Sequence, residues 1–150
     1  MVDEARFDVA VETARLREAS RQVGAITTFL GVVRDINEDA SVSALFLEHY
    51  PGMTERQIHD ILDEARARWD VIAATVIHRV GQLEPTDEIV YVGVASQHRG
   101  DAFDACEFII DYLKTRATFW KKERTDDGER WLVTRESDVC AAESWKSGNR

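Results

Sequence analysis

VIAATVIHRVGQLEPTDEIVYVGVAS (residues 71–96) is the stretch that decides the fold class of this 150-residue chain. Its two ends, 71–80 and 88–96, are apolar and rich in β-branched residues, which predicts two buried strands. Between them, GQLEPTD carries the glycine, proline and aspartate typical of a turn. No helix fits between the two strands, which favours antiparallel pairing over a parallel crossover.

Apolar segments on both sides of this stretch predict further strands. VGAITTFLGVV and VSALFLEHY are two of them, and the polar segment RDINEDAS between them is expected to be a mobile loop. Near the C-terminus, an Asp-Gly turn separates two strand-like runs, which predicts a hairpin. The predicted strands are 23–33, 42–50, 119–125 and 129–133, and the predicted loop is 34–41.

Three segments predict helices that begin at recognisable caps. Thr13 is expected to cap the first helix, Thr54 with Gln57 the second in a capping-box pattern, and Asp101 the third. The second helix also places its apolar residues at the helical i, i+3, i+4, i+7 spacing. The predicted helices are 13–22, 54–69 and 101–116, and the tail after residue 135 is expected to form a short helix or to stay loose.

The order of these elements is helix, two strands, helix, two strands, helix, hairpin. Such an order favours an α+β fold with a largely antiparallel sheet, three helices and a C-terminal hairpin, and not a doubly wound sheet. No repeat or linker interrupts the sequence, so residues 1–150 are expected to form a single domain.

Composition excludes several classes of partner. A net charge of −9 argues against nucleic acid and anionic membrane surfaces. No apolar run is long enough to cross a membrane, and the acidic first residues do not form a signal peptide. Cys106 and Cys140 are therefore expected to be reduced thiols in a cytoplasmic protein. Neither is a good nucleophile, because Cys106 lies on an apolar helix stripe and Cys140 lies among acidic residues.

Motifs for nucleotides and metals are missing as well. The sequence has neither a Walker-type loop nor a Rossmann glycine fingerprint. Its four histidines lack the spacing of metal ligands and have no cysteine partners nearby, so no metal site is expected. The histidines are His49, His59, His78 and His98.

The segment KTRATFWKKER (114–124) holds five basic residues and one acid in this acidic chain. Such a concentration of cations predicts a pocket for a small anion. Lys114 could equally serve only to stabilise the end of its helix, where cations are favoured. Lys121 and Lys122 point to opposite faces of a strand, so at most one of them can share a pocket with Lys114.

His98 and Arg99 lie where a predicted strand meets a predicted helix. A helix N-terminus directs free N–H groups outward, so this junction suits phosphate. An ordinary surface turn is the alternative. Arg34 follows another buried strand, at a position common both to binding residues and to solvated ones.

Several longer segments resemble the large, catalytic subunit of molybdopterin synthase. They cover nearly the whole chain from residue 24 onward, and the combination of LEHYPGMTE with DYLKTRATFWKKE is highly specific. The resemblance implies the hammerhead-like α/β fold of that family. The matching segments are GAITTFLGVVRD (24–35), LEHYPGMTE (47–55), VIHRVGQLEPTDEIVYVGVASQHR (76–99), FIIDYLKTRATFWKKE (108–123) and ERWLVTRESD (129–138).

The family resemblance implies a sulfurtransferase that converts cyclic pyranopterin monophosphate into molybdopterin for molybdenum cofactor biosynthesis. It implies that both sulfurs come from a thiocarboxylate on the C-terminal Gly-Gly of a small ubiquitin-like subunit. A homodimer of the large subunit would form the core of a heterotetramer. Neither a cofactor nor a metal is implied.

The resemblance also implies which residues form the site. Lys114 and Lys121 would be catalytic, with Lys114 acting on the thiocarboxylate and Lys121 neutralising charge as the cyclic phosphate opens. Val32 stands where some relatives carry a lysine, so its role would be limited to backbone contacts. The implied substrate-binding residues are Val32, Val33, Arg34, His98, Arg99, Lys122, Glu123 and Arg135.

Two other functions remain open at this point. A non-catalytic module that binds a ubiquitin-like protein would keep the fold but lack the cationic pocket. An unrelated phosphoester or pterin enzyme would use the same anion site without the thiocarboxylated partner.

Overall fold

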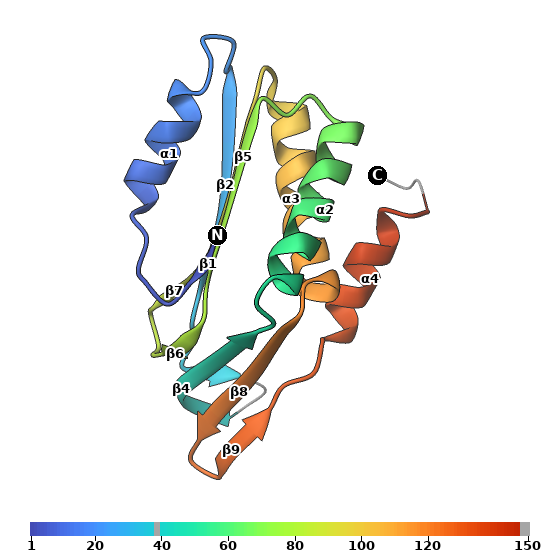
Figure 1. Ribbon diagram of the computed structural model, residues 1–150. Helices are drawn as coiled ribbons and strands as arrows, with labels where there is room; N and C mark the ends of the chain where they lie inside the picture. The colour runs from blue at the N-terminus through green and yellow to red at the C-terminus, as the bar shows by residue number, and fades with distance from the viewer. Residues whose placement is uncertain (38–39, 148–150) are drawn as a thin grey trace.

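The computed structural model describes residues 1–37 and 40–147, which form two sheets with helices packed against them (Figure 1). One sheet has the order β1-β5-β7-β2, and the other has the order β3-β4-β8-β9 with β6 paired to β4. The strands are β1 (Val2–Asp3), β2 (Ala25–Val32), β3 (Ile36–Asn37), β4 (Ala40–His49), β5 (Ala73–Arg79), β6 (Gly81–Leu83), β7 (Glu88–Ser96), β8 (Phe119–Thr125) and β9 (Gly128–Trp131). The helices are α1 (Val9–Glu18), α2 (Met53–Arg68), α3 (Arg99–Arg116) and α4 (Glu136–Ser144).

The first sheet is built around β7, which pairs antiparallel with both β5 and β2. This confirms the antiparallel pairing predicted for 71–80 and 88–96. Its central strand, β7, is buried on both faces: α1 lies on one side of the sheet, and α2 and α3 lie on the other (Figure 1). Tyr91 contacts the α1 side, whereas Val92 and Val94 pack against α3, as the alternation of a strand requires.

The second sheet confirms the predicted C-terminal hairpin, in which β8 and β9 meet at Thr125 and Gly128. The segment 34–41, predicted to be a mobile loop, instead contains β3 and the start of β4, and these two strands pair with each other. Residues 38 and 39 of that segment lie outside the described residues. The tail takes the first of its two predicted forms, because α4 makes a fourth helix.

All three predicted helix caps are wrong. Asp8 caps α1, and its carboxylate accepts hydrogen bonds from the N–H groups of Ala10 and Val11 at 2.9 and 3.2 Å. Asp101 lies inside α3, which begins two residues earlier, and its carboxylate accepts from the N–H of Asp70 at 3.0 Å. Polar side chains near a helix start can bond elsewhere, so the cap pattern alone does not fix the first residue.

In the second helix, the two residues predicted to form the cap, Thr54 and Gln57, bond elsewhere. Gly52 is the true N-cap of α2, and its N–H donates to the carboxylate of Glu55 at 2.6 Å. Thr54 is buried and donates its hydroxyl to the carbonyl of Thr118 at 2.9 Å, while Gln57 accepts from the Thr118 N–H at 2.8 Å. These two bonds hold the chain immediately before β8, the strand that supplies part of the candidate site.

No helix in the described part of the chain is long and apolar enough to cross a membrane.

Candidate active site

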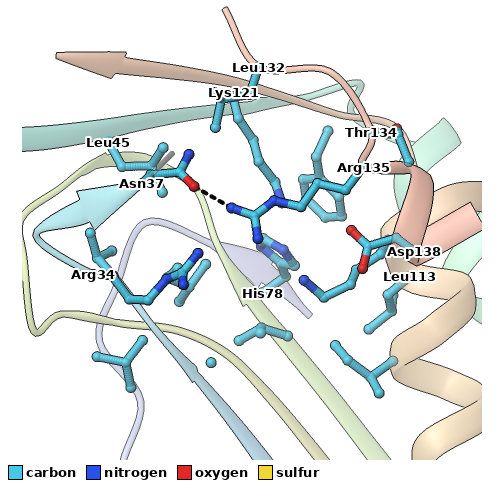
Figure 2. Close-up of a pocket in the computed structure, with 18 of the residues that line it drawn as sticks. Arg34, Asn37, Leu45, His78, Leu113, Lys121, Leu132, Thr134, Arg135 and Asp138 are labelled. Atoms are coloured by element: carbon cyan, nitrogen blue, oxygen red, sulfur yellow. Dashed lines mark hydrogen bonds between the residues drawn. The ribbon is translucent and has the colours of Figure 1, made fainter. Parts of the chain in front are cut away.

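A cavity of about 550 Å³ lies where the end of β2, the last turn of α3, β8 and the segment before α4 come together (Figure 2). Part of its wall is apolar and includes Val33, Leu45 and Leu113. Its charged lining is mostly cationic and comes from four separate elements of the chain. The lining cations are Arg34, Lys114, Lys121 and Arg135.

The end of β2 brings Val32, Val33 and Arg34 to the cavity. The pairing of β2 with β7 shifts register between Gly31 and Val32, which turns the strand end away from the regular ladder. The backbone of Val33 then bonds to the turn that precedes β7: its N–H donates to Asp87 and its carbonyl accepts from Thr86, both at 2.9 Å. Arg34 follows directly and is exposed at the cavity mouth.

The two lysines that line the cavity lie at different depths. Lys114, in the last turn of α3, is exposed at the mouth, and Lys121 of β8 is half-buried. Burial lowers the pKa of Lys121 below its ordinary value, and the charges of Lys114 and Arg135 lower it further, whereas Asp138 opposes the shift. The protein environment therefore makes the proton of Lys121 easier to remove.

Lys122 does not line the cavity. Its side chain lies on the opposite face of β8, where the amine is 3.3 Å from the carboxylate of Glu129. The same amine lies 5.6 Å from the centre of the Phe46 ring and 5.4 Å from that of Trp131. The alternation of the strand thus separates Lys121 from Lys122, as the sequence predicts.

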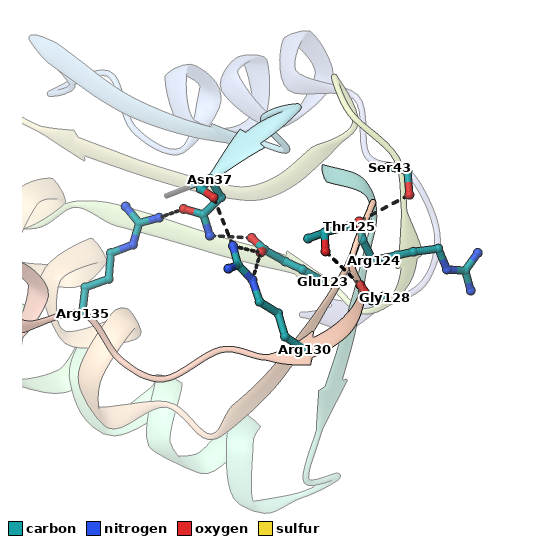
Figure 3. A network of polar contacts seen from close by, with 8 residues as sticks. All are labelled: Asn37, Ser43, Glu123, Arg124, Thr125, Gly128, Arg130 and Arg135. Atoms are coloured by element: carbon teal, nitrogen blue, oxygen red, sulfur yellow. Dashed lines mark hydrogen bonds and ion pairs between the residues drawn. The ribbon is translucent and has the colours of Figure 1, made fainter. Parts of the chain in front are cut away.

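Glu123 lines the cavity, but its carboxylate is engaged by other side chains (Figure 3). It accepts from the Asn37 amide at 2.5 Å and from the Arg130 guanidinium at 3.0 Å. Arg130 also donates to the carbonyl of Asn37 at 3.0 Å, and the Asn37 side-chain oxygen accepts from Arg135. Glu123 therefore orients Asn37, which in turn orients Arg135 at the cavity.

His98 and Arg99 are not brought to this cavity. His98 is the N-cap of α3 and Arg99 its first residue, whereas Lys114 lies in its last turn. About four turns of helix, or roughly 22 Å, separate Arg99 from Lys114. Within one chain, His98 and Arg99 therefore lie at the opposite end of α3 from Lys114, the cavity cation that this helix carries.

The structure adds three residues that sequence reasoning missed: Asn37, His78 and Arg130. Asn37 gave no signal, because its side-chain partners Glu123 and Arg135 lie 86 and 98 residues away in the chain. Arg130 bonds to Glu123 across the β8–β9 hairpin, so the predicted hairpin could have indicated this pair. His78 was considered only as a metal ligand. It lines the cavity and stacks on Phe119 with 3.8 Å between ring centroids, and burial lowers its pKa to about 3.

The arrangement suits a molecule that combines an anionic group with a flat ring. The cations of the mouth can bind phosphate oxygens, with arginine able to do so through two hydrogen bonds. The apolar wall can take the face of a ring. Within residues 1–37 and 40–147, no group of three or more His, Cys, Asp or Glu side chains could hold a metal ion.

Comparisons with known proteins show which family the chain belongs to. Residues 2–116 match the family described as MoaE protein. The molybdopterin synthase catalytic subunit of Yersinia pestis is 61% identical over 139 residues, which cover 93% of this chain and 91% of that protein.

Two solved structures share the fold. The molybdopterin biosynthesis MoaE protein of Burkholderia ambifaria has a TM-score of 0.83 at 47% identity, over 97% of this chain and 95% of that one. A complex of subunits 1 and 2 of the molybdopterin-converting factor of Helicobacter pylori contains a chain with a TM-score of 0.72 at 18% identity, over 89% and 90% of the two chains, which supports the fold alone. Family match, full-length identity and fold lead to one conclusion: the chain belongs to the MoaE protein family, that of the molybdopterin synthase catalytic subunits.

Proposed function

We propose that this chain is a sulfurtransferase that converts cyclic pyranopterin monophosphate into molybdopterin. The sulfur would come from a thiocarboxylate on the C-terminal glycine of a small ubiquitin-like subunit. The observation that carries the proposal is the cavity in which Arg34, Lys114, Lys121 and Arg135 surround an apolar wall. Its volume of about 550 Å³ is in the range of small-molecule sites.

The proposed roles follow from depth and charge. Arg34 and Arg135, exposed at the mouth, bind the phosphate, and Val32 and Val33 border the substrate. Lys114 orients the thiocarboxylate through its charge. The thiocarboxylate sulfur forms a C–S bond to a substrate carbon as the bond from that carbon to an oxygen of the cyclic phosphate breaks. Water then cleaves the acyl–sulfur bond, which leaves the partner as a carboxylate and the sulfur on the substrate as a thiol. Lys121 neutralises the charge that develops as the cyclic phosphate opens.

Glu123 and Lys122 receive narrower roles than direct substrate binding. Glu123 acts through Asn37 and Arg135, because its carboxylate already bonds to Asn37 and Arg130. Lys122 faces away from the cavity and belongs to the outer surface of the second sheet.

His98 and Arg99 fit the proposal only through a second copy of the chain. They lie roughly 22 Å from Lys114 along α3, so they cannot reach the same substrate within one chain. We assign them to the phosphate of a neighbouring site in a homodimer core, with one small subunit at each end of a heterotetramer. A cytoplasmic location is part of the proposal and is supported by two cysteines that form no disulfide.

A single-turnover assay tests the proposal with purified protein, cyclic pyranopterin monophosphate and a thiocarboxylated small subunit. Molybdopterin is measured as its oxidised fluorescent derivative. We expect product from the wild type and none from Lys114→Ala, whose thermal melt should be unchanged because Lys114 is exposed. Lys146→Ala, which removes an exposed lysine after α4, is the matched control and should react normally.

Two outcomes would contradict the proposal. Wild-type protein that binds the partner but forms no product would indicate the non-catalytic binding module. Full turnover by Lys114→Ala would remove Lys114 from the catalytic role and leave the cavity without its proposed centre.

A further inference from the structure

His78 presents one bound and one free ring nitrogen. Its Nδ1 lies 2.8 Å from the carbonyl oxygen of Arg79. A carbonyl can only accept, so Nδ1 carries the proton, and in the neutral ring Nε2 is an acceptor with an exposed lone pair. The Arg79 bond therefore determines which tautomer faces the cavity.

The free nitrogen opens on the cavity. His78 is only 6% exposed, lines the cavity, and within the described part of the chain forms no hydrogen bond through Nε2. No nitrogen or oxygen of a described buried side chain is both sealed from solvent and unpartnered, so Nε2 is reached from the cavity. Figure 2 shows the imidazole in the middle of the cavity, below Arg135. Stacking on Phe119, with 18° between the ring planes, leaves the edge of the imidazole facing the cavity.

The chemistry of Nε2 differs from that of its neighbours. The cations of the cavity can only donate hydrogen bonds. Glu123 accepts, but its carboxylate is engaged by Asn37 and Arg130, and Asp138 is a charged acceptor beside Lys121. Burial, together with the charges of Lys121, Lys114 and His49, lowers the pKa of His78 to about 3, so the ring stays neutral at working pH. His78 thus offers an uncharged acceptor to a ligand that brings an N–H or O–H group.

We propose that Nε2 of His78 accepts a hydrogen bond from a ring N–H of the reduced pterin and thereby selects the reduced ring over its oxidised form. This inference rests on the proposed function, since it concerns the substrate of the same cavity. Reduced pterins carry hydrogens on ring nitrogens that are bare lone pairs in the aromatic form. A bare nitrogen opposite Nε2 would place two acceptors together with no hydrogen between them, and such mismatches are strongly rejected in buried sites.

Equilibrium binding without the small subunit tests this inference, because no reaction then occurs. The probes are cyclic pyranopterin monophosphate and the fully oxidised aromatic pterin phosphate prepared from it, measured by anaerobic calorimetry. We expect wild-type protein to bind the reduced form on the order of 10-fold more tightly. A wild-type ratio near one would overturn the inference without any variant.

Two substitutions test the two ring nitrogens of His78 separately. His78→Asn places an amide near the position of Nδ1, where it can still donate to Arg79, but has nothing at Nε2. His78→Gln extends an amide toward the position of Nε2, where its oxygen can accept. We expect His78→Asn to reduce the preference to within about 2-fold and His78→Gln to retain part of it. Thermal melts of both variants report any loss of folding.

The outcomes also distinguish this inference from the proposed function. Folded His78→Asn protein with the wild-type preference would overturn the inference alone. Equal weakening of both ligands would do the same, because it indicates a structural role. If wild-type protein binds neither form, the proposed function fails and the inference fails with it.

Discussion

The two faces of β8 give two adjacent lysines opposite environments. Lys121 points into the cavity, where burial and neighbouring cations lower its pKa. Lys122 points outward and rests between two aromatic rings beside Glu129. The residue type and the local sequence are the same, so only the side of the sheet differs. A cluster of positive charge in a sequence therefore contains functional and structural members, and strand alternation separates them.

The largest expected effect comes from replacing Lys121, the lysine that faces the cavity. Lys121→Met should lower the rate constant in the single-turnover assay by roughly 100- to 1000-fold, because a preorganised charge next to a developing anion is lost. Lys122→Met is the matched control, one residue away on the outer face, and should keep this rate constant within about 3-fold. Similar losses from both variants would mean that the two faces do not divide function from structure.

A second variant changes Glu123, which lies on the same face of β8 as Lys121. Glu123→Gln removes the charge that holds Arg130 and weakens the bonds that orient Asn37 and Arg135. Because Glu123 is only 4% exposed while Arg130 is partly open to solvent, we expect a loss of about 2 kcal/mol in the free energy of unfolding. Urea denaturation measures it.

The matched control for Glu123→Gln is Glu129→Gln on the outer edge of the hairpin. Glu129 contacts Lys122 and Arg124 at the surface, where ion pairs contribute little, so its replacement should leave the urea midpoint unchanged. Equal shifts for both glutamines would contradict the distinction between the inner network and the outer pairs.

The smallest expected effect concerns the stability cost of the inner lysine. The folded-state pKa of Lys121 is lowered, so folding disfavours its protonated form and the unfolded chain holds the proton more tightly. Lys121→Met should therefore raise the free energy of unfolding by about 1 kcal/mol near pH 7. This advantage should shrink as the pH approaches the ordinary lysine value of 10.5, because wild-type stability rises where the folded protein has lost this proton and the unfolded chain still binds it.

Urea denaturation of wild type and Lys121→Met at several pH values measures that difference. An advantage that grows with pH would mean that the folded protein favours protonated Lys121.

The sequence predicted the elements whose signal is local. Alternation and turn residues were sufficient for the β5–β7 pair and for the β8–β9 hairpin. Helix starts were missed because Thr54, Gln57 and Asp101 bond to distant backbone groups instead of their own helix ends. Such bonds depend on the tertiary fold, which no cap pattern contains.

For the same reason, the sequence predicted only part of the candidate site. Lys114 and Lys121 are close in sequence and stand in one basic segment, so composition pointed to them. Asn37 meets Glu123 only after β3 has paired with β4, and β4 with β8. The sequence did not indicate the proposed role of His78, because that role depends on which ring nitrogen bonds to the carbonyl of Arg79.

The turn before β7 has a consequence for how this chain can vary. Thr86 has a φ of 76°, a left-handed conformation that β-branched residues rarely adopt, and its N–H is bonded to the carbonyl of Val33. The backbone carbonyl of the next residue, Asp87, accepts from the N–H of Val33. The two bonds therefore fix the number of residues between Leu83 and Glu88. An inserted or deleted residue here would slide Arg34 along the cavity mouth. Substitutions in this turn can therefore be tolerated, whereas insertions and deletions cannot.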